Sequence, residues 1–270
     1  MSAVPHRKGY NRQADIPDDL RQGLNCGEAE SRTLSEWLAV DRLGLLMHVL
    51  PAVGLAWAEK QLQEHIQPLV TLKVTGQMKG IGKALDAVCR NHAQRQEILE
   101  ALSVHPSDTV RAWGAYMLRA DETLPLPERL DSVRRYATDG NMCVRECAWD
   151  SFRPYVAADL DTGLALLAGW VVDPDANIRR CAVEGTRPCG VWTAHIPVLK
   201  ADPALGLGIL EPVRADPSRY VQTAVGNWLN DAGKSQPDWA CQLTQQWLVE
   251  SPCPETAWIV KHGRRRLNCS

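Results

Sequence analysis

The chain has 270 residues and 45% hydrophobic content, which suits one extended repeat domain or two compact domains and excludes a disordered chain. Its formal net charge of −2 gives no global support for binding to nucleic acid or membranes, so a nucleic-acid binder would need its basic residues on one face. No signal peptide and no membrane-spanning apolar run is apparent, so we expect a cytoplasmic protein.

Cysteine usage also indicates a reducing compartment. The chain has nine cysteines, an odd number with no regular framework, and we expect all nine to be free thiols. Cys143 and Cys147 lie four residues apart, but no histidine pair has matching spacing. We therefore expect small buried apolar residues at these positions, with no metal and no cofactor.

In chain order, residues 1–30 are polar and predict an N-terminal arm, followed by a single helical domain over residues 31–270. No segment alternates long enough to require a strand, and the β-branched stretch 69–74 is short and isolated, so the fold class is all-α. Helices are predicted at 34–50, 54–67, 81–91, 94–104, 107–119, 127–137, 142–152, 162–172, 175–184, 203–213, 218–230, 237–250 and 254–267.

An internal repeat organises the second half of the chain. A turn followed by an amphipathic helix occurs four times, with aligned apolar residues at Val110, Val144, Ile178 and Val221. The first three are 34 residues apart, and the last follows after 43. This periodicity predicts a helical solenoid, and the Asp-Pro turn with a later Val-Arg pair is HEAT-like. An arginine or glutamine follows each apolar residue: Arg111, Arg145, Arg179 and Gln222.

The third copy, residues 173–192, differs from the others. Within nine residues it carries an acid, Glu184, a Gly-Thr-Arg-Pro break over 185–188, and a tryptophan, Trp192. Such a conjunction interrupts a regular repeat, so we expect function there.

Two motifs carry a family resemblance: Glu-Gly-Thr-Arg-Pro at 184–188 and Asn-Trp-Leu-Asn-Asp at 227–231. Together they resemble the AlkC/AlkD superfamily of DNA alkylation repair proteins, especially the AlkC branch, and residues 34–41 and 258–262 are also similar to that branch. The resemblance implies a C-shaped, right-handed HEAT-like solenoid that grips double-stranded DNA on its concave face. It also implies a monomeric bacterial DNA glycosylase, nucleoid-associated when bound, that removes N3- or N7-alkylated purines.

By position, the resemblance assigns the catalytic acids to Glu184 and Asp231 and an active-site aromatic to Trp192. Two departures affect this site. The branch carries a further glutamate just upstream of an Arg-Pro-Phe, whereas Trp149 precedes Arg153-Pro154-Tyr155 here. Cys189-Gly190-Val191 also replaces the Arg-Leu-Pro of the branch.

The chemistry explains why acids and an indole suit such a site. An alkylated purine is already cationic and leaves as a neutral base, while the sugar becomes oxocarbenium-like. A carboxylate about 4 Å away contributes roughly 4 kcal/mol at an effective dielectric of about 20. An indole face adds about 0.5–2 kcal/mol. Together these correspond to roughly three to four powers of ten in rate, enough for a labile bond.

Each residue also has a structural alternative: Glu184 pairs with Arg187, Asp231 pairs with Lys234, and Trp192 anchors the core. A carboxylate at a helix C-terminus is electrostatically unfavourable, which favours a role for Asp231 beyond stability. Candidate phosphate contacts are Arg153, Arg187, Lys234, Lys261, His262 and Arg265.

Three functions remain open. The first is a DNA glycosylase for alkylated purines, favoured by a basic concave face that holds Glu184 and Asp231. The second is a non-catalytic relative that binds distorted or branched DNA, favoured if these acids are buried in ion pairs. The third is a protein-interaction scaffold, favoured by a neutral or apolar groove.

Overall fold

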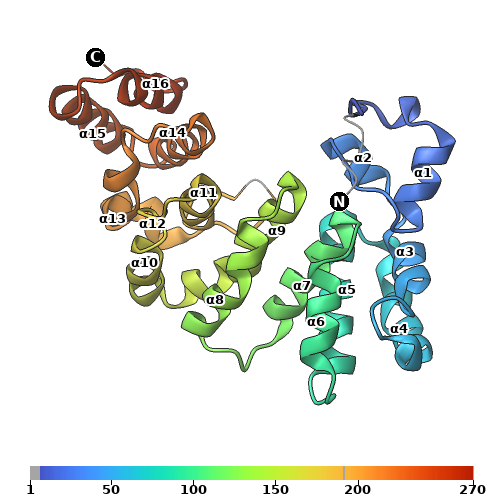
Figure 1. Cartoon of the computed structure of the whole chain (residues 1–270). Helices are drawn as coiled ribbons and strands as arrows, with labels where there is room; N and C mark the ends of the chain where they lie inside the picture. The colour runs from blue at the N-terminus through green and yellow to red at the C-terminus, as the bar shows by residue number, and fades with distance from the viewer. Residues whose placement is uncertain (1–6, 191, 270) are drawn as a thin grey trace. The chain divides into compact units, whose positions relative to one another are not determined.

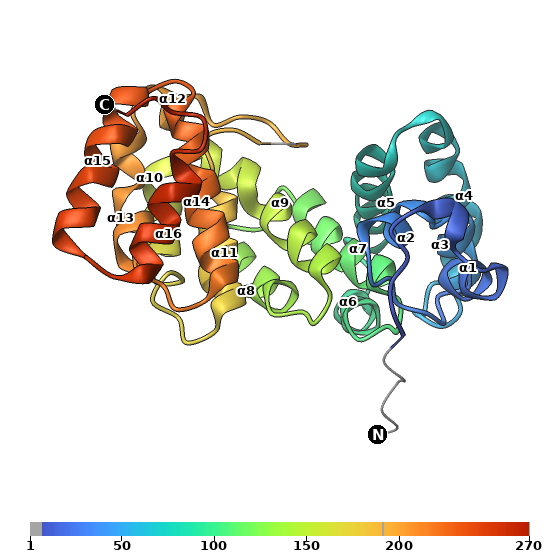
Figure 2. The same ribbon diagram turned by 90° about the horizontal axis from the view of Figure 1, so that it is seen from above.

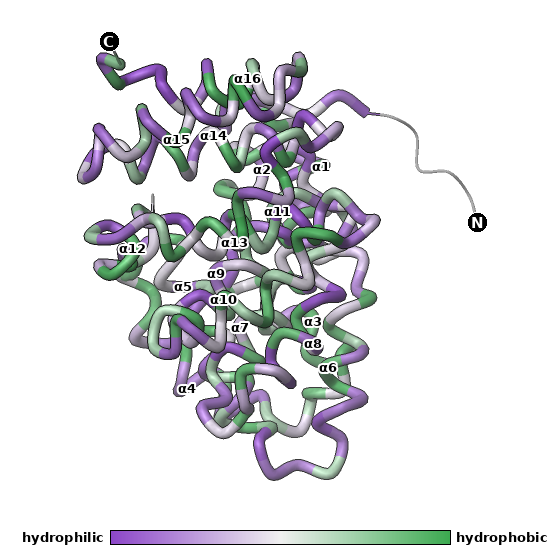
Figure 3. Tube along the Cα trace, turned by 90° about the vertical axis from the view of Figure 1, so that its left-hand side faces the viewer, coloured by the Kyte–Doolittle hydropathy of each residue, from purple (hydrophilic) through white to green (hydrophobic). Residues whose placement is uncertain are grey.

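The computed structural model describes residues 7–190 and 192–269, and over these residues the chain is helical without a strand (Figure 1). The all-α, HEAT-like prediction is confirmed. In the part of the chain that is described, no helix is both long and apolar enough to cross a bilayer. Polar and apolar residues alternate along the helices, as expected where each helix buries one side (Figure 3).

The described residues form two compact units. The N-terminal unit comprises residues 7–125 and 139–148, and the C-terminal unit comprises 126–138, 149–190 and 192–269. The predicted division into an arm and a single domain stays a prediction. Helices of the N-terminal unit are α1 (Asp18–Asn25), α2 (Leu34–Ala39), α3 (Arg42–Val49), α4 (Glu59–Ile66), α5 (Val74–Cys89), α6 (Arg95–Ser103) and α7 (Asp108–Ala120).

Helix α9 (Met142–Ala158) begins in the N-terminal unit and ends in the C-terminal one. The other helices of the C-terminal unit are α8 (Leu126–Ala137), α10 (Leu160–Ala168), α11 (Ala176–Gly185), α12 (Pro197–Ala201), α13 (Leu207–Leu210), α14 (Arg219–Gly233), α15 (Pro237–Glu250) and α16 (Pro254–Gly263). Within this unit, α14 packs against α11, α15 and α16 (Figures 1 and 2).

Several predicted helix boundaries are wrong for local reasons. The segment predicted as 34–50 is divided into α2 and α3, because Asp41 caps a new helix by accepting from the Gly44 N–H. Helix α9 continues through Pro154 to Ala158, and Phe152 and Val156, two residues before and after the proline, are both buried. The segment 203–213 consists of two short 3-10 turns around α13, since it contains two prolines and two glycines.

Each repeat begins with the same hydrogen-bonded turn, which gives the sequence pattern a physical basis. One turn side chain accepts from the backbone N–H two residues later: His105 from Ser107, Asp139 from Asn141, Asp173 from Asp175 and Asp216 from Ser218. The aligned arginine or glutamine then donates to the carbonyl of that turn residue: Arg111 to His105, Arg145 to Asp139, Arg179 to Asp173 and Gln222 to Asp216. The side chain six residues into each copy therefore closes its turn.

The arginines also connect consecutive repeats. Arg111 donates two bonds to the Asp139 carboxylate at 2.7 and 3.0 Å, and Arg179 donates two to Asp216 at 2.6 and 3.0 Å. These bidentate pairs fix one turn against the next. Gln222, in the last copy, keeps the carbonyl bond but has no guanidinium to extend the series.

Buried polar residues within the N-terminal unit hold Ser31, which precedes α2, against the start of α7 and the turn before α9. The Ser31 N–H donates to Asp108 at 3.2 Å, and the Ser31 hydroxyl donates to the same carboxylate. Asn141 donates to the Ser31 carbonyl at 2.7 Å. Burial raises the pKa of Asp108 to about 6, although both bonds from Ser31 oppose the rise.

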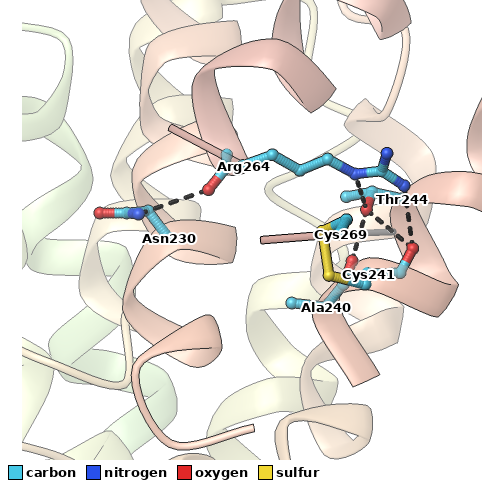
Figure 4. Close-up of a disulfide and its surroundings, with 7 residues drawn as sticks. Asn230, Ala240, Cys241, Thr244, Arg264 and Cys269 are labelled. Carbon is cyan, nitrogen blue, oxygen red and sulfur yellow. Dashed lines mark hydrogen bonds between the residues drawn. A yellow bond between two sulfur atoms is a disulfide. The ribbon is translucent and has the colours of Figure 1, made fainter. Parts of the chain in front are cut away.

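The prediction of nine free thiols is wrong. Cys241 on α15 and Cys269 in the tail after α16 form a disulfide, with a Cα–Cα distance of 5.4 Å (Figure 4). Arg264 donates to the Thr244 hydroxyl and to the Cys241 carbonyl, which turns the tail back along α15. The other seven cysteines are not part of a disulfide. Among the described residues, no group of three His, Cys, Asp or Glu side chains could hold a metal ion.

Candidate active site

The Gly-Thr-Arg-Pro segment after α11 is fixed by close packing. A Cβ on Gly185 would lie 2.4 Å from the Phe152 ring, so only glycine lets α11 end this close to α9. Thr186 bonds back to the carbonyls of α11, and the Trp228 indole donates to the Thr186 carbonyl at 3.1 Å. The end of α11 is therefore held by both α9 and α14.

Arg153 anchors the same segment from α9. Its guanidinium donates to the backbone carbonyls of Gly185, Arg187 and Ala194 at distances of 2.7 to 3.2 Å. The side chain is buried, and this burial lowers the pKa of Arg153 to about 10. Arg153 was predicted as a phosphate contact, but the structure buries it as the anchor of the loop and gives it no surface for a phosphate.

Arg187 joins the two predicted acids. Its guanidinium donates to Glu184 at 2.9 Å and to Asp231 of α14 through Nε at 2.8 Å and Nη2 at 2.7 Å. Burial opposes the charge on Arg187, but the two carboxylates outweigh it and raise its pKa above the ordinary arginine value. The motifs at 184–188 and 227–231, which carry the family resemblance, therefore meet at one side chain.

Two further cations complete this group. Lys234 donates to Asp231 Oδ1 at 2.7 Å, and Arg180 lies 3.4 Å from Glu184 while its guanidinium covers the Tyr220 ring. We call Arg180, Glu184, Arg187, Asp231 and Lys234 the Arg187 cluster. Its three cations and two anions give a net charge of +1. The cluster can attract an anion at its exposed edge.

Both acids are thus buried and ion-paired, at 4% exposure for Glu184 and 3% for Asp231. This is the arrangement that the sequence analysis associated with the non-catalytic function. The two local pairings expected there, Glu184 with Arg187 and Asp231 with Lys234, are both present.

Trp192 is 37% exposed and does not anchor the core. Its ring lies 4.9 Å from that of Trp149, tilted by 47°. Trp149 itself is buried on α9, one turn before Arg153. The tryptophan that stands in place of the glutamate of the AlkC branch therefore packs against Trp192 of the loop. Val191, beside Trp192, lies outside the described residues. A Cβ on Gly190 would lie 2.4 Å from the Thr193 carbonyl oxygen, so the turn that presents Trp192 requires glycine.

Three other predicted phosphate contacts belong to α16 and the tail that follows it. His262 and Arg265 both contact the Asn227 amide oxygen, at 3.1 and 3.0 Å, while Lys261 is exposed. The pKa of His262 is lowered by burial and by the nearby Arg265. The motif at 227–231 is thus contacted at both ends. Arg187 and Lys234 contact Asp231 at its last residue, and His262 and Arg265 contact Asn227 at its first.

Sequence reasoning missed the parts played by Asn227, Arg180 and Tyr220. Asn227 opens the second motif, so a motif signal was present. Arg180 was visible only as one of several basic residues, and its cation–π contact with Tyr220 depends on α11 packing against α14.

A family model described as "DNA alkylation repair enzyme" matches residues 75–246. The chain belongs to this family. The resemblance to the AlkC/AlkD superfamily is confirmed. An uncharacterized protein, YhaZ of Bacillus subtilis (strain 168), is 39% identical over 115 residues, which are 43% of this chain and 32% of that protein.

Two solved structures are also similar to this chain. The alkylpurine DNA glycosylase AlkC of Pseudomonas fluorescens, bound to DNA containing an abasic site analog, has a TM-score of 0.71 and 27% identity. That similarity covers 91% of this chain and 64% of AlkC, so the chain spans less than two thirds of that protein and about a third of YhaZ. AlkD2 from Streptococcus mutans has a TM-score of 0.58 at 18% identity over 78% of this chain and 98% of its own, which shows the shared fold alone.

Proposed function

We propose that this protein is a DNA glycosylase that excises purines alkylated at N3 or N7, of the 3-methyladenine class, from double-stranded DNA in base excision repair. One observation carries the proposal. The two motifs shared with the AlkC branch converge on Arg187 beside the loop that presents Trp192, in a chain 27% identical to an alkylpurine DNA glycosylase.

The proposed chemistry uses the two carboxylates of the cluster as negative charge beside a positive sugar. The alkylated base is cationic and departs as a neutral molecule, so no strong general acid is required. Asp231 stabilises the oxocarbenium-like sugar and orients the attacking water, and the exposed face of Trp192 supports the same positive charge. Glu184 keeps Arg187 in place and adds to the negative charge nearby.

The proposed DNA contacts follow from charge and accessibility. Lys234, Lys261 and Arg265 are exposed, and Arg187 and His262 are partly exposed. All five belong to the C-terminal unit. Contacts of this type recognise the phosphate backbone without reading sequence. The protein should therefore bind duplexes of different sequence with similar affinity.

Base release from a methylated duplex tests the enzyme directly. The wild type should release 3-methyladenine from DNA treated with a methylating agent. Asp231→Asn should keep the fold and DNA binding while the release rate falls about a hundredfold or more, because it removes preorganised charge from the reacting sugar. Glu184→Gln should act in the same direction. Equal rates for the wild type and Asp231→Asn would remove Asp231 from the mechanism.

A second candidate is favoured by the ion pairs themselves. Carboxylates already neutralised by arginine and lysine stabilise a cation less, and the Arg187 cluster has a net charge suited to binding an anion. A non-catalytic relative that recognises distorted or branched DNA would have this arrangement. Release of no base by the wild type, together with tighter binding to a bulged or four-way-branched DNA than to a linear duplex, would establish it.

A further inference from the structure

The three cations of the Arg187 cluster differ in how freely each can leave its carboxylate. The Lys234 side chain is 46% exposed, whereas those of Arg187 and Arg180 are 14% and 12% exposed. Lysine is also a compact charge on a flexible stem, while arginine holds carboxylates in a fixed two-bond geometry. Lys234 is therefore the cation of this cluster that can turn toward solvent.

Asp231 shares its two oxygens between different partners. Oδ2 accepts both bonds from Arg187, at 2.7 and 2.8 Å, and Oδ1 accepts the bond from Lys234 at 2.7 Å. In the free protein, Lys234 thus covers the oxygen that Arg187 leaves available. A carboxylate covered on both oxygens is poorly placed to stabilise a second cation, such as the developing charge of a sugar.

Losing Lys234 would not leave a buried charge without a partner. Removing the sole partner of a buried ion is strongly destabilising, but Asp231 would keep both bonds to Arg187. Losing Arg187 would instead affect Glu184 and Asp231 together. The cluster is therefore built so that one contact can open while the rest stays in place.

We propose that Lys234 exchanges partners: it covers Asp231 in the free protein and moves to a DNA phosphate when a duplex binds. The exchange uncovers Oδ1 of Asp231 as the sugar arrives, so this carboxylate oxygen is available to the sugar only in the complex. This inference rests on the proposed function for the use made of Asp231. The exchange itself is a property of DNA binding and can be measured without base release.

A double-mutant cycle on DNA binding tests the exchange, with a short duplex containing one abasic-site analogue as the probe. Because Asp231 competes with phosphate for Lys234, Asp231→Asn should bind this duplex more tightly than wild type, by about three- to fivefold, the effect of a partly exposed ion pair. In a Lys234→Met background the same substitution should change affinity less than twofold.

The salt dependence gives an independent readout. Lys234→Met should reduce the slope of log K against log salt by about 0.9, the contribution of one phosphate contact, and Lys234→Arg should restore it. Circular dichroism of each variant verifies that the helical fold is intact. A slope equal to wild type in Lys234→Met, or an equal effect of Asp231→Asn in both backgrounds, would overturn the exchange.

These outcomes also separate the two proposals. Coupling between Asp231 and Lys234 without any base release would support the exchange and contradict the glycosylase. Base release that depends on Asp231, with no coupling in binding, would support the glycosylase and contradict the exchange.

Discussion

Asp108 in the N-terminal unit and Asp231 in the C-terminal unit are both buried carboxylates on repeat helices, α7 and α14, but they have different kinds of partner. Asp108 accepts from the backbone and hydroxyl of Ser31, both neutral groups. Asp231 accepts from two cations, Arg187 and Lys234. The same residue type is thus buried once among neutral donors and once among charges.

Neutral and cationic partners give the two carboxylates different roles. Neutral partners leave the desolvation of Asp108 incompletely compensated, and burial raises its pKa to about 6. Its role is to hold Ser31, which precedes α2, against the start of α7. Arg187 and Lys234 compensate the desolvation of Asp231, and the Lys234 side chain is about half exposed. A charge held in that way can be released to a ligand without unfolding the site.

The largest expected effect on stability follows the loss of Arg187. This side chain pairs with both acids of the C-terminal site, whereas Asp108 in the N-terminal unit accepts from the neutral Ser31. Arg187→Met leaves Glu184 and Asp231 buried without their shared partner, so the free energy of unfolding should fall by about 3–5 kcal/mol. Urea unfolding followed by tryptophan fluorescence measures this. The exposed Arg266→Met is the matched control and should change stability by less than about 0.5 kcal/mol. A loss below 1 kcal/mol for Arg187→Met would mean that solvent, and not Arg187, compensates the two acids.

The second effect concerns pH and Asp108. Because its pKa is raised in the folded protein, Asp108 contributes stability that is present below about pH 4 and is lost as the pH rises through about 6. Relative to Asp108→Asn, the wild type should lose about 2 kcal/mol of unfolding free energy between pH 4 and pH 7.

Unfolding titrations of both proteins across this range measure the difference. Asp15→Asn, at an exposed acid of the same unit, serves as the control and should show no change of that size. A stability difference between wild type and Asp108→Asn that stays constant from pH 4 to pH 7 would show that the carboxylate does not titrate in this window.

A smaller effect is expected at the connection between repeats, where Arg179 forms a single ion pair with Asp216. Arg179→Gln imitates the natural Gln222: it keeps the bond to the Asp173 carbonyl and loses the pair with Asp216. The unfolding free energy should fall by about 1–3 kcal/mol, since the Asp216 carboxylate is buried. Arg179→Met loses both interactions and should cost about 1 kcal/mol more. Wild-type stability in Arg179→Gln would show that the carbonyl bond alone holds the turn.

The sequence predicted those features that depend on residues near one another or on a strict period. The pattern of a turn followed by a helix, which occurs four times, predicted the register of the repeats. The pairs of Glu184 with Arg187 and of Asp231 with Lys234 follow from their spacing of three residues at the end of a helix. The joining of the two motifs through Arg187 was not predictable, because it requires α11 to pack on α14.

Other features depend on backbone atoms or on the path of the chain. Arg153 donates only to carbonyl groups of a loop more than 30 residues away, so its sequence position resembled that of any basic surface residue. The exposure of Trp192 depends on the turn at Gly190 and on support from Trp149. The disulfide between Cys241 and Cys269 depends on a tail that turns back along α15.

The most direct test compares the matched variants Asp231→Asn and Asp108→Asn. The measurement is single-turnover release of 3-methyladenine from a methylated duplex, with enzyme in excess. The account predicts that Asp231→Asn remains folded and DNA-bound while its release rate falls about a hundredfold or more. Asp108→Asn should release the base at the wild-type rate per folded molecule, because its carboxylate serves the fold alone. Release by Asp231→Asn at the wild-type rate, or an equal loss in both variants, would contradict it.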